Sequence, residues 1–272
     1  MTLTVRNPDI DLSLGFDRHW YGGNLAVTHV FNALSMLFPQ GEKFFIDATK
    51  VVASQTDLSN NPKLAKEIKS FVSQEVTHSH HHQVYNDTLE KQGFPNTIEP
   101  TIIWLNELSL RKLSPLTNLA FVSAYEHYTA ILGDFILKKP ELLEPAQKEL
   151  AIVWGWHCVE ETEHKAVCFD LYKFAGGGWL RRVITFLNVS ISFMIFFLRA
   201  YLGMLYQDGG LHPKRIYKTL SEAIPFFWGR KGFMWHLIFH SVKYLSPRFH
   251  PWNYDNSADA LNWIKSNQKA FK

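Results

Sequence analysis

Apolar side chains recur every three or four residues over most of the chain, which is the period of an α-helix. Proline and glycine divide this pattern into segments, and strand-like alternation is scarce. Because Pro39 suits the first turn of a helix, we expect one helix to end before it and another to begin there. The pattern predicts an all-α protein with helices over 24–38, 39–54, 62–92, 97–113, 115–138 and 145–175.

The segment 62–92 carries an apolar stripe whose centre is polar. Positions that step by four and three share one helix face, and here that face is apolar at both ends. It must therefore be buried, and a buried carboxylate is costly unless it is paired or bound to a metal. The stripe consists of Leu64, Ile68, Phe71, Glu75, His78, His82, Tyr85 and Leu89.

The segment 145–175 repeats this arrangement. Glu163 lies off the face, where we expect it in solvent, and Glu160 borders the face. Cys158 and Cys168 lie ten residues apart in the same expected helix, about 15 Å along its axis, so they cannot pair. The stripe consists of Leu150, Trp154, His157, Glu161, His164, Cys168 and Leu171.

Each stripe contains a Glu-x-x-His motif, namely Glu75 with His78 and Glu161 with His164. In four-helix bundles, two such motifs and one glutamate from each of the two other helices form a dimetal site. The sequence should therefore supply two more interior glutamates.

Glu126 is the only acidic residue in the stripe of 115–138 and meets this requirement. Glu42 meets it in 39–54, with Asp47 as its competitor. A glutamate in a first helical turn also favours the helix dipole, which weakens the argument for Glu42. The alternative to a metal site is a set of hydrogen-bonded core histidines with surface glutamates.

The order of these residues resembles the ferritin-like di-iron carboxylate superfamily, over roughly residues 24–175. His157, four residues before Glu161, makes the pattern similar to that of p-aminobenzoate N-oxygenase and its relatives, whose di-iron site has four glutamates and three histidines. The resemblance implies a ferritin-like four-helix bundle core with extra C-terminal helices. The metal ligands and catalytic residues would be Glu42, Glu75, His78, Glu126, His157, Glu161 and His164.

The whole chain also resembles a bacterial family labelled "predicted metal-dependent hydrolase". The stretches that carry this likeness are "SQEVTHSHHHQVYN", "WHCVEETEHKAVCFD" and "SPRFHPWNYDN". This label implies a dimetal-dependent hydrolase. Hydrolysis needs an open coordination position, for which seven protein ligands leave little room.

The main functional prediction is therefore a di-iron oxygenase or oxidase, an oxidoreductase that uses O2 on an apolar amine or lipid-like substrate. The expected cofactor is two iron ions (Fe2+/Fe3+), because mixed carboxylate and imidazole ligands suit iron or manganese; manganese or a mixed-metal pair is the alternative. An electron donor protein is a further expected partner. A hydrolase is the first alternative function, and a non-catalytic iron-binding protein is the second.

Several neighbours are expected to hold the ligands in place. In the ferritin-like pattern, the residue before each motif contacts the histidine of the other motif. This predicts that Glu160 contacts His78 and that Gln74 has the matching neutral role near His164. His82 is an eighth ligand, an orienting partner or a pocket residue. Tyr85 and Tyr125 are redox-active or hydrogen-bonding neighbours, with core packing as the alternative.

The C-terminal third has a different composition. Residues 183–198 carry no charge, and the helix over about 183–206 lies in a membrane interface, is buried in a core or dimer, or spans a membrane. We expect a dimetal-binding bundle over 1–178 and an apolar, aromatic-rich helical extension over 179–272. Peripheral contact with the inner membrane and a homodimer are further expectations.

Composition narrows the remaining classes. Hydrophobic residues make up 46% of the 272 residues, which indicates a globular protein. The net charge of +3, without a dense basic run, argues against a nucleic-acid partner. The first residues do not resemble a secretory signal, and two cysteines suit a reducing compartment. The expected location is the cytoplasm.

Overall fold

Helices form every regular element of residues 2–271, the part of the chain that the computed structural model describes. The prediction of an all-α fold is confirmed. The α-helices are α1 (Leu25–Ser54), α2 (Pro62–Lys91), α3 (Glu99–Lys112), α4 (Pro115–Leu137), α5 (Lys148–His164), α6 (Val167–Phe174), α7 (Trp179–Gln207), α8 (Ile216–Trp228), α9 (Phe233–Tyr244) and α10 (Ser257–Ser266). Short 3-10 helices cover Leu12–Leu14, Pro140–Leu142, Pro251–Asn253 and Gln268–Ala270.

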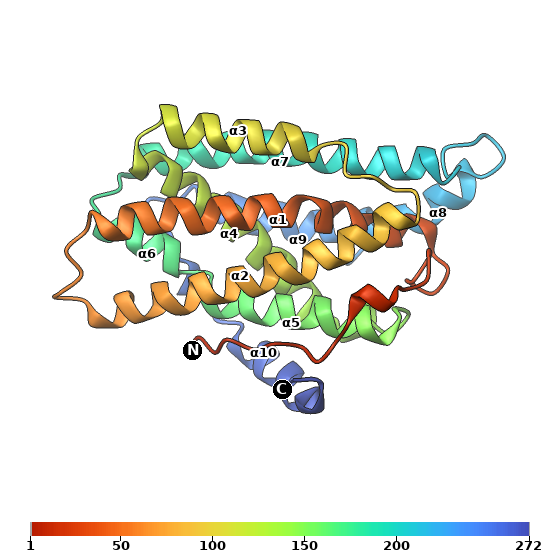
Figure 1. Cartoon of the computed structure of the whole chain (residues 1–272), viewed down its shortest axis with the longest axis horizontal. Helices are drawn as coiled ribbons and strands as arrows, with labels where there is room; N and C mark the ends of the chain where they lie inside the picture. The colour runs from red at the N-terminus through yellow and green to blue at the C-terminus, as the bar shows by residue number, and fades with distance from the viewer. Residues whose placement is uncertain (1, 272) are drawn as a thin grey trace.

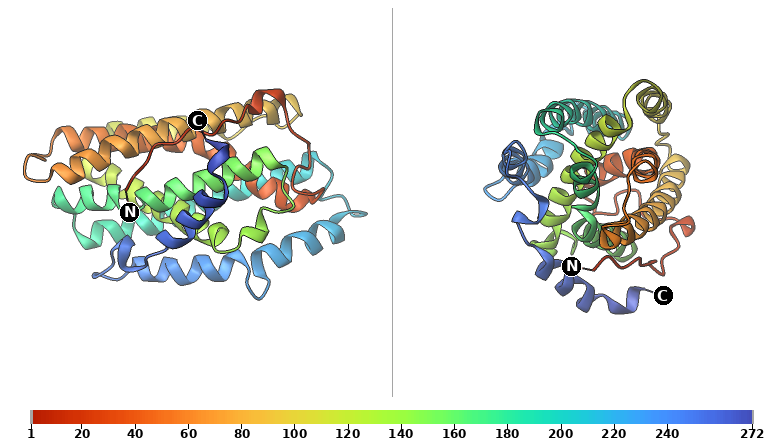
Figure 2. Two further views of the ribbon diagram at one scale, coloured as in Figure 1. Left: turned by 90° about the horizontal axis from the view of Figure 1, so that it is seen from below. Right: turned by 90° about the vertical axis from the view of Figure 1, so that its left-hand side faces the viewer.

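The centre of the molecule is a bundle of α1, α2, α4 and α5, which α6 prolongs (Figure 1). α1 packs along α2 and α4, while α5 packs against both α4 and α2. α7 covers α1 and α4 from outside, and α10 rests on α5 (Figure 2). Two apolar clusters fill the bundle, one around Trp154 and Tyr85 and the other around Phe71 and Leu171. Along α2 and α5–α6, the polar residues of the two stripes lie between these clusters and are buried.

Local signals explain where the bundle helices begin. The side chains of Asn24, Asn61 and Ser114 each accept a hydrogen bond from the backbone N–H three residues later. Such caps satisfy one of the free N–H groups of a first helical turn. Pro62 and Pro115 follow two of these caps, at the position where a missing N–H costs nothing.

The predicted break at Pro39 is wrong, because α1 runs through it without interruption. A proline inside a helix leaves the carbonyl four residues earlier without its usual donor. Here that carbonyl belongs to Ser35, and it accepts a hydrogen bond of 2.9 Å from Asn86 Nδ2 of α2. The neighbouring helix thus replaces the missing bond, which a local sequence pattern does not reveal.

The single helix expected over 145–175 is also wrong. α5 ends at His164, and α6 begins at Val167. At the interruption, Lys165 Nζ donates hydrogen bonds to the Tyr254 carbonyl at 2.8 Å and to Asn256 Oδ1 at 2.7 Å. The buried stripe nevertheless continues across the interruption, since all seven of its positions are buried.

Candidate metal centre

Four glutamates and three histidines converge in the middle of the bundle. They come from four helices, and none is more than 3% exposed. The structure therefore brings together all seven residues that the sequence nominated as ligands. They are Glu42 of α1, Glu75 and His78 of α2, Glu126 of α4, and His157, Glu161 and His164 of α5.

The seven side chains form two neighbouring groups. In one group, His164 Nε2 lies 3.2 Å from Glu75 Oε1 and 3.2 Å from Glu126 Oε2. The other group contains Glu42, His78 and His157, and one ligand atom of each lies within 4.8 Å of the others.

Glu75 and Glu161 face both groups. Glu161 lies 3.3 Å from His164 through Oε2 and 3.1 Å from His157 Nε2 through Oε1. Glu75 Oε1, which lies 3.2 Å from His164 Nε2, also lies 3.8 Å from His78 Nδ1. If each group held a metal ion, these two carboxylates would lie beside both ions.

The atoms that point into the centre have no hydrogen-bond partner among residues 2–271. Buried polar groups are normally paired, so an unpaired set of this size requires an explanation. Metal ions fit, because carboxylate oxygens and neutral imidazole nitrogens are the donors that iron, manganese and zinc accept. The unpaired atoms are both oxygens of Glu42, Glu75 and Glu126, Oε2 of Glu161, Nδ1 of His78, and Nε2 of His157 and His164.

Gln74 fixes the orientation of His164. Its amide nitrogen donates to the Thr4 carbonyl and to Glu163 Oε2, both at 3.1 Å. Its carbonyl oxygen must then face His164 Nδ1, which lies 3.1 Å away. We therefore assign a proton of His164 to Nδ1, so that Nε2 faces the carboxylates. Burial lowers the pKa of His164, but Glu126 and Glu161 raise it well above its usual range, so a cation bound at Nε2 would replace a proton there.

Glu160 has the corresponding role for His78. Its Oε2 lies 3.1 Å from His78 Nε2, so the predicted contact is present. Burial raises the pKa of Glu160 to about 8, and the Arg6 backbone N–H, 2.8 Å from Oε1, opposes that rise. When the carboxylate is ionised, it accepts from His78 Nε2 and leaves Nδ1 free to bind a metal.

A chain of hydrogen bonds fixes the third histidine and defines the role of His82. Asn86 Oδ1 accepts from Ser35 Oγ at 2.8 Å, so this hydroxyl in turn accepts from His82 Nδ1 at 2.9 Å. His82 Nε2 then accepts from His157 Nδ1, 2.9 Å away. The Nε2 lone pair of His157 is thereby directed at the centre. His82 lies in the layer behind the ligands, and its nitrogens are both used.

Burial opposes the ionisation of all four carboxylates, but His164 and His157 hold the pKa of Glu161 well below its usual range. Burial and repulsion from neighbouring glutamates raise the pKa of Glu42 and Glu75 well above its usual range. Burial also raises the pKa of Glu126, to about 7, although His164 opposes the rise. Cations between these groups would remove the repulsion and hold the carboxylates ionised.

The expectation of a solvated Glu163 is wrong. Glu163 is 2% exposed, and its Oε1 lies 2.8 Å from Arg6 Nη2. Its Oε2 accepts from the Thr4 backbone N–H at 3.0 Å. The N-terminal segment lies over this side of α5 and covers a position that the helical pattern places outside the stripe. Arg6, more than 150 residues away in sequence, carried no signal of this role.

The other residues predicted to lie near the seven candidate ligands have different surroundings. Asp47 is half-buried and pairs with Lys43, which leaves Glu42 as the acidic residue that α1 contributes. Tyr85 donates to Asn32 Oδ1 at 2.6 Å and packs against Trp154 in the apolar core. Tyr125 lies 3.5 Å from Ser192 Oγ in the wall of a cavity. Ser35 and Asn86, which hold His82, were also not predicted from the sequence, although Asn86 follows His82 by one helical turn.

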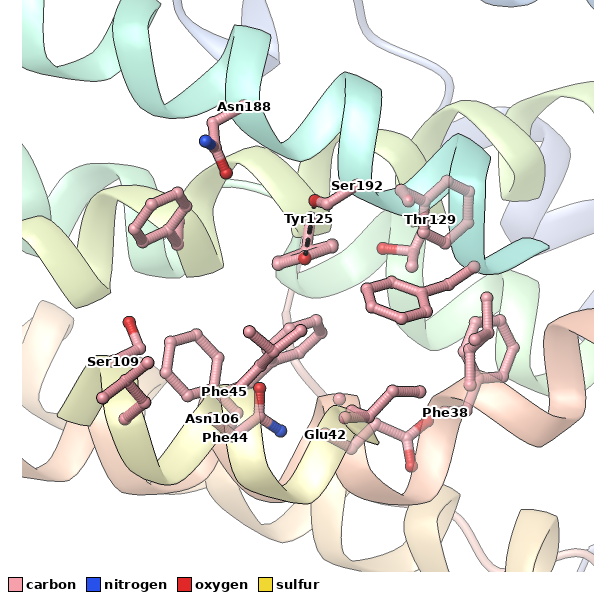
Figure 3. Close-up of a pocket in the computed structure, with 18 of the residues that line it drawn as sticks. Phe38, Glu42, Phe44, Phe45, Asn106, Ser109, Tyr125, Thr129, Asn188 and Ser192 are labelled. Atoms are coloured by element: carbon pink, nitrogen blue, oxygen red, sulfur yellow. Dashed lines mark hydrogen bonds between the residues drawn. The ribbon is translucent and has the colours of Figure 1, made fainter. Parts of the chain in front are cut away.

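An apolar cavity of about 500 Å³ reaches the centre from the side of α3 and α7 (Figure 3). Glu42 and Glu161 are the two candidate ligands in its wall. Phe38, Phe44 and Phe45 supply much of the apolar surface around Glu42. A small set of polar groups lies on the opposite wall, namely Tyr125, Thr129, Asn188 and Ser192. The cavity suits an apolar molecule with few polar groups.

Fold and site together define an all-α protein with a buried cluster of carboxylate and histidine ligands for metal ions. The chain belongs to the family described as "Predicted metal-dependent hydrolase", whose model matches residues 4–255. No curated protein and no solved structure matches it. Metal dependence therefore rests on both the family and the site, while the resemblance to ferritin-like di-iron enzymes stays a prediction.

Proposed function

We propose that the seven residues hold two metal ions and that these ions are iron. We further propose that the protein is an O2-dependent oxidoreductase acting on an apolar substrate. The observation that carries this proposal is the convergence of unpaired buried ligand atoms at the end of an apolar cavity. Glu42, His78 and His157 would hold one ion, and Glu126 and His164 the other. Glu75 and Glu161 would serve both.

Two ferrous ions bound by these residues would supply the electrons that O2 activation requires. The chain's own residues then have three tasks. Glu160, Gln74 and His82 keep each ligand histidine in the tautomer that binds a cation. The phenylalanines of the cavity exclude water and hold an apolar group beside Glu42 and Glu161. Tyr125 and Thr129 offer hydroxyl groups that can orient a polar end of the substrate.

Metal-dependent hydrolysis is the second candidate function, and the family description favours it over oxidation. A hydrolase would need water beside the metal ions and a group that protonates the leaving group. The cavity wall offers hydroxyl and amide groups for such contacts, but it is mainly apolar. We therefore prefer oxidation as the function, because the cavity wall is mainly apolar and seven protein ligands leave little room for a metal-bound water.

Elemental analysis and Mössbauer spectra of the iron-supplemented protein test the metal proposal. We expect two iron ions per chain and a coupled diferric signal after the ferrous protein meets O2. Glu42→Gln should lower the metal content, whereas Asp47→Asn on the same helix should not, because Asp47 pairs with Lys43 away from the seven residues. Two zinc or manganese ions without a response to O2, together with O2-independent cleavage of apolar esters, would transfer the assignment to hydrolysis.

A further inference from the structure

α7 exposes a continuous apolar stripe although its other face is packed. Residues such as Phe186, Val189 and Phe197 are buried on the packed side, where α7 lies against α1 and α4. The exposed residues step by three and four, so they share one face, and Ile191 is 64% exposed. They are Ile184, Leu187, Ile191, Ile195, Leu198 and Leu202.

α8 and α9 extend this surface. In Figure 2, α7, α8 and α9 lie along the same side of the bundle. The three helices line an open apolar groove of about 900 Å³. Together with the stripe of α7, the exposed apolar residues of α8 and α9 form what we call the apolar face. Those residues are Leu220, Ile224, Trp228, Trp235, Ile238, Phe239 and Val242. A surface of this extent on a folded protein marks an interaction site.

The charge of the chain is divided in a way that indicates the partner. Residues 179–272 contain 13 lysines and arginines but only 4 aspartates and glutamates, a net charge of +9. Residues 1–178 contain 15 basic and 21 acidic residues, a net charge of −6. The exposed basic residues of the extension lie within or beside α7, α8 and α9. They include Arg181, Arg199, Lys214, Arg215, Lys218, Arg230, Lys231 and Lys243.

This combination fits the surface of an anionic bilayer. Apolar side chains enter the acyl region, lysine and arginine pair with acidic headgroups, and tryptophan and tyrosine prefer the boundary between them. Exposed aromatic residues at this boundary would include Trp179, Tyr206, Tyr217 and Trp235. A second copy of the chain fits poorly, because pairing two such faces would bring together two strongly basic surfaces.

The orientation of α7 indicates docking on a bilayer and not insertion across it. Within residues 2–271, α7 is the one helix that is long and apolar enough to span a membrane. However, its packed face holds Arg182, which is 2% exposed and donates to the Ser246 carbonyl at 2.5 Å. Arg199 adds a charge to the exposed side. Spanning would require α7 to leave α1 and α4, whereas lying on the surface preserves these contacts.

The apolar face is also connected to the metal centre. The groove and the cavity beside Glu42 share three wall residues, Phe38, Thr129 and Phe193. An extended acyl chain that enters the groove therefore needs only to pass these side chains to reach the wall containing Glu42 and Glu161.

We propose that α7, α8 and α9 dock on an anionic phospholipid bilayer, and that the groove between them passes the acyl chain of a membrane lipid toward the metal centre. The docking surface stands on its own, whereas the identity of the substrate as a lipid rests on the proposed function.

Sedimentation with vesicles tests the docking. The metal-loaded protein should bind phosphatidylglycerol-containing vesicles at least about tenfold more tightly than vesicles of phosphatidylcholine alone, and salt should weaken this binding. Ile191→Glu/Ile195→Glu and Arg230→Glu/Lys231→Glu should each weaken it about tenfold or more. Leu14→Glu is the matched control, since Leu14 is 85% exposed on another element and should leave binding unchanged.

Metal content and oligomeric state are measured on the same samples. The surface variants should keep the metal content of the parent, so weaker binding would not reflect loss of the centre. Equal binding by all variants, or none by the parent, would overturn the docking and leave the metal proposal intact. A dimer that Ile191→Glu/Ile195→Glu converts to a monomer, without vesicle binding by the parent, would assign the face to a second copy. Vesicle binding by a protein that takes up no metal would support docking and refute the proposed function.

Discussion

The three candidate ligand histidines differ in which nitrogen faces the centre, and a different partner sets each choice. His78 presents Nδ1 because Glu160 occupies Nε2, whereas His157 and His164 present Nε2. The Glu-x-x-His motifs and their spacing predict which residues converge. They do not predict the partner of His157, because that hydrogen-bond chain crosses from α2 to Ser35 of α1 and back.

His82→Ala should lower the affinity for metal by about 10- to 100-fold, because His157 loses the acceptor that orients its ring. His82→Gln should retain more affinity, since a side-chain carbonyl can replace the acceptor. His80→Ala is the control, because His80 is exposed on the same helix. Titration with ferrous iron or zinc under anaerobic conditions measures all three. Equal affinities for His82→Ala and the parent would refute the orienting role.

At the scale of helices, the bundle depends on close approaches that the apolar pattern predicts only in part. The stripes indicate which faces are buried, and all of the stripe positions of α2 and α5–α6 are buried. The pattern does not give the distance between helices. α4 comes so close to α5 at Gly133 that an added Cβ would lie 2.9 Å from the Cys158 carbonyl oxygen.

Gly133→Ala should therefore destabilise the protein by about 1–3 kcal/mol, because the backbone of α5 must move away. The same shift would separate Glu126 from Glu161, so the metal content should fall as well. Gly203→Ala in α7 is the matched control, because nothing lies within 4 Å of the added Cβ. Alanine at this helical position should raise the free energy of unfolding by at most about 1 kcal/mol. Urea unfolding measures both, and equal stability of Gly133→Ala and the parent would contradict the close approach.

At the scale of the whole molecule, contacts distant in sequence join the extension to the bundle. Asp208, just after α7, lies 2.8 Å from Arg18 Nε and 2.9 Å from His29 Nε2 of α1. Arg6 similarly joins the N-terminal segment to α5. Composition predicted that the extension differs from the bundle, but such pairings depend on the folded path of the chain. The division at residue 178 stays a prediction.

Asp208 should make the free energy of unfolding depend on pH in the acidic range. Burial alone would raise its pKa, but hydrogen bonds from His19, His29 and Arg18 lower it from 3.8 to about 2. The folded state therefore resists protonation, so this stabilisation is complete above about pH 4 and is lost as the pH falls toward 2. The free energy of unfolding of Asp208→Asn should be lower than that of the parent at pH 5, and the difference should shrink by pH 2. Asp17→Asn, at an exposed position, should show no such change.

Pro39 has a consequence for how α1 and α2 align. The carbonyl that it leaves free lies on Ser35, and Asn86 binds both this carbonyl and the Ser35 hydroxyl. Sliding α1 by one turn along α2 would leave this carbonyl unpaired. The same shift would break the hydrogen-bond chain that orients His157. The proline thus helps to set the register of α1 against α2, because the free Ser35 carbonyl finds its donor in this alignment. The same alignment places Glu42 close to His78 and His157. Proline usually destabilises a helix. Here it makes misaligned packings of α1 on α2 unfavourable, although the apolar stripe alone would permit them.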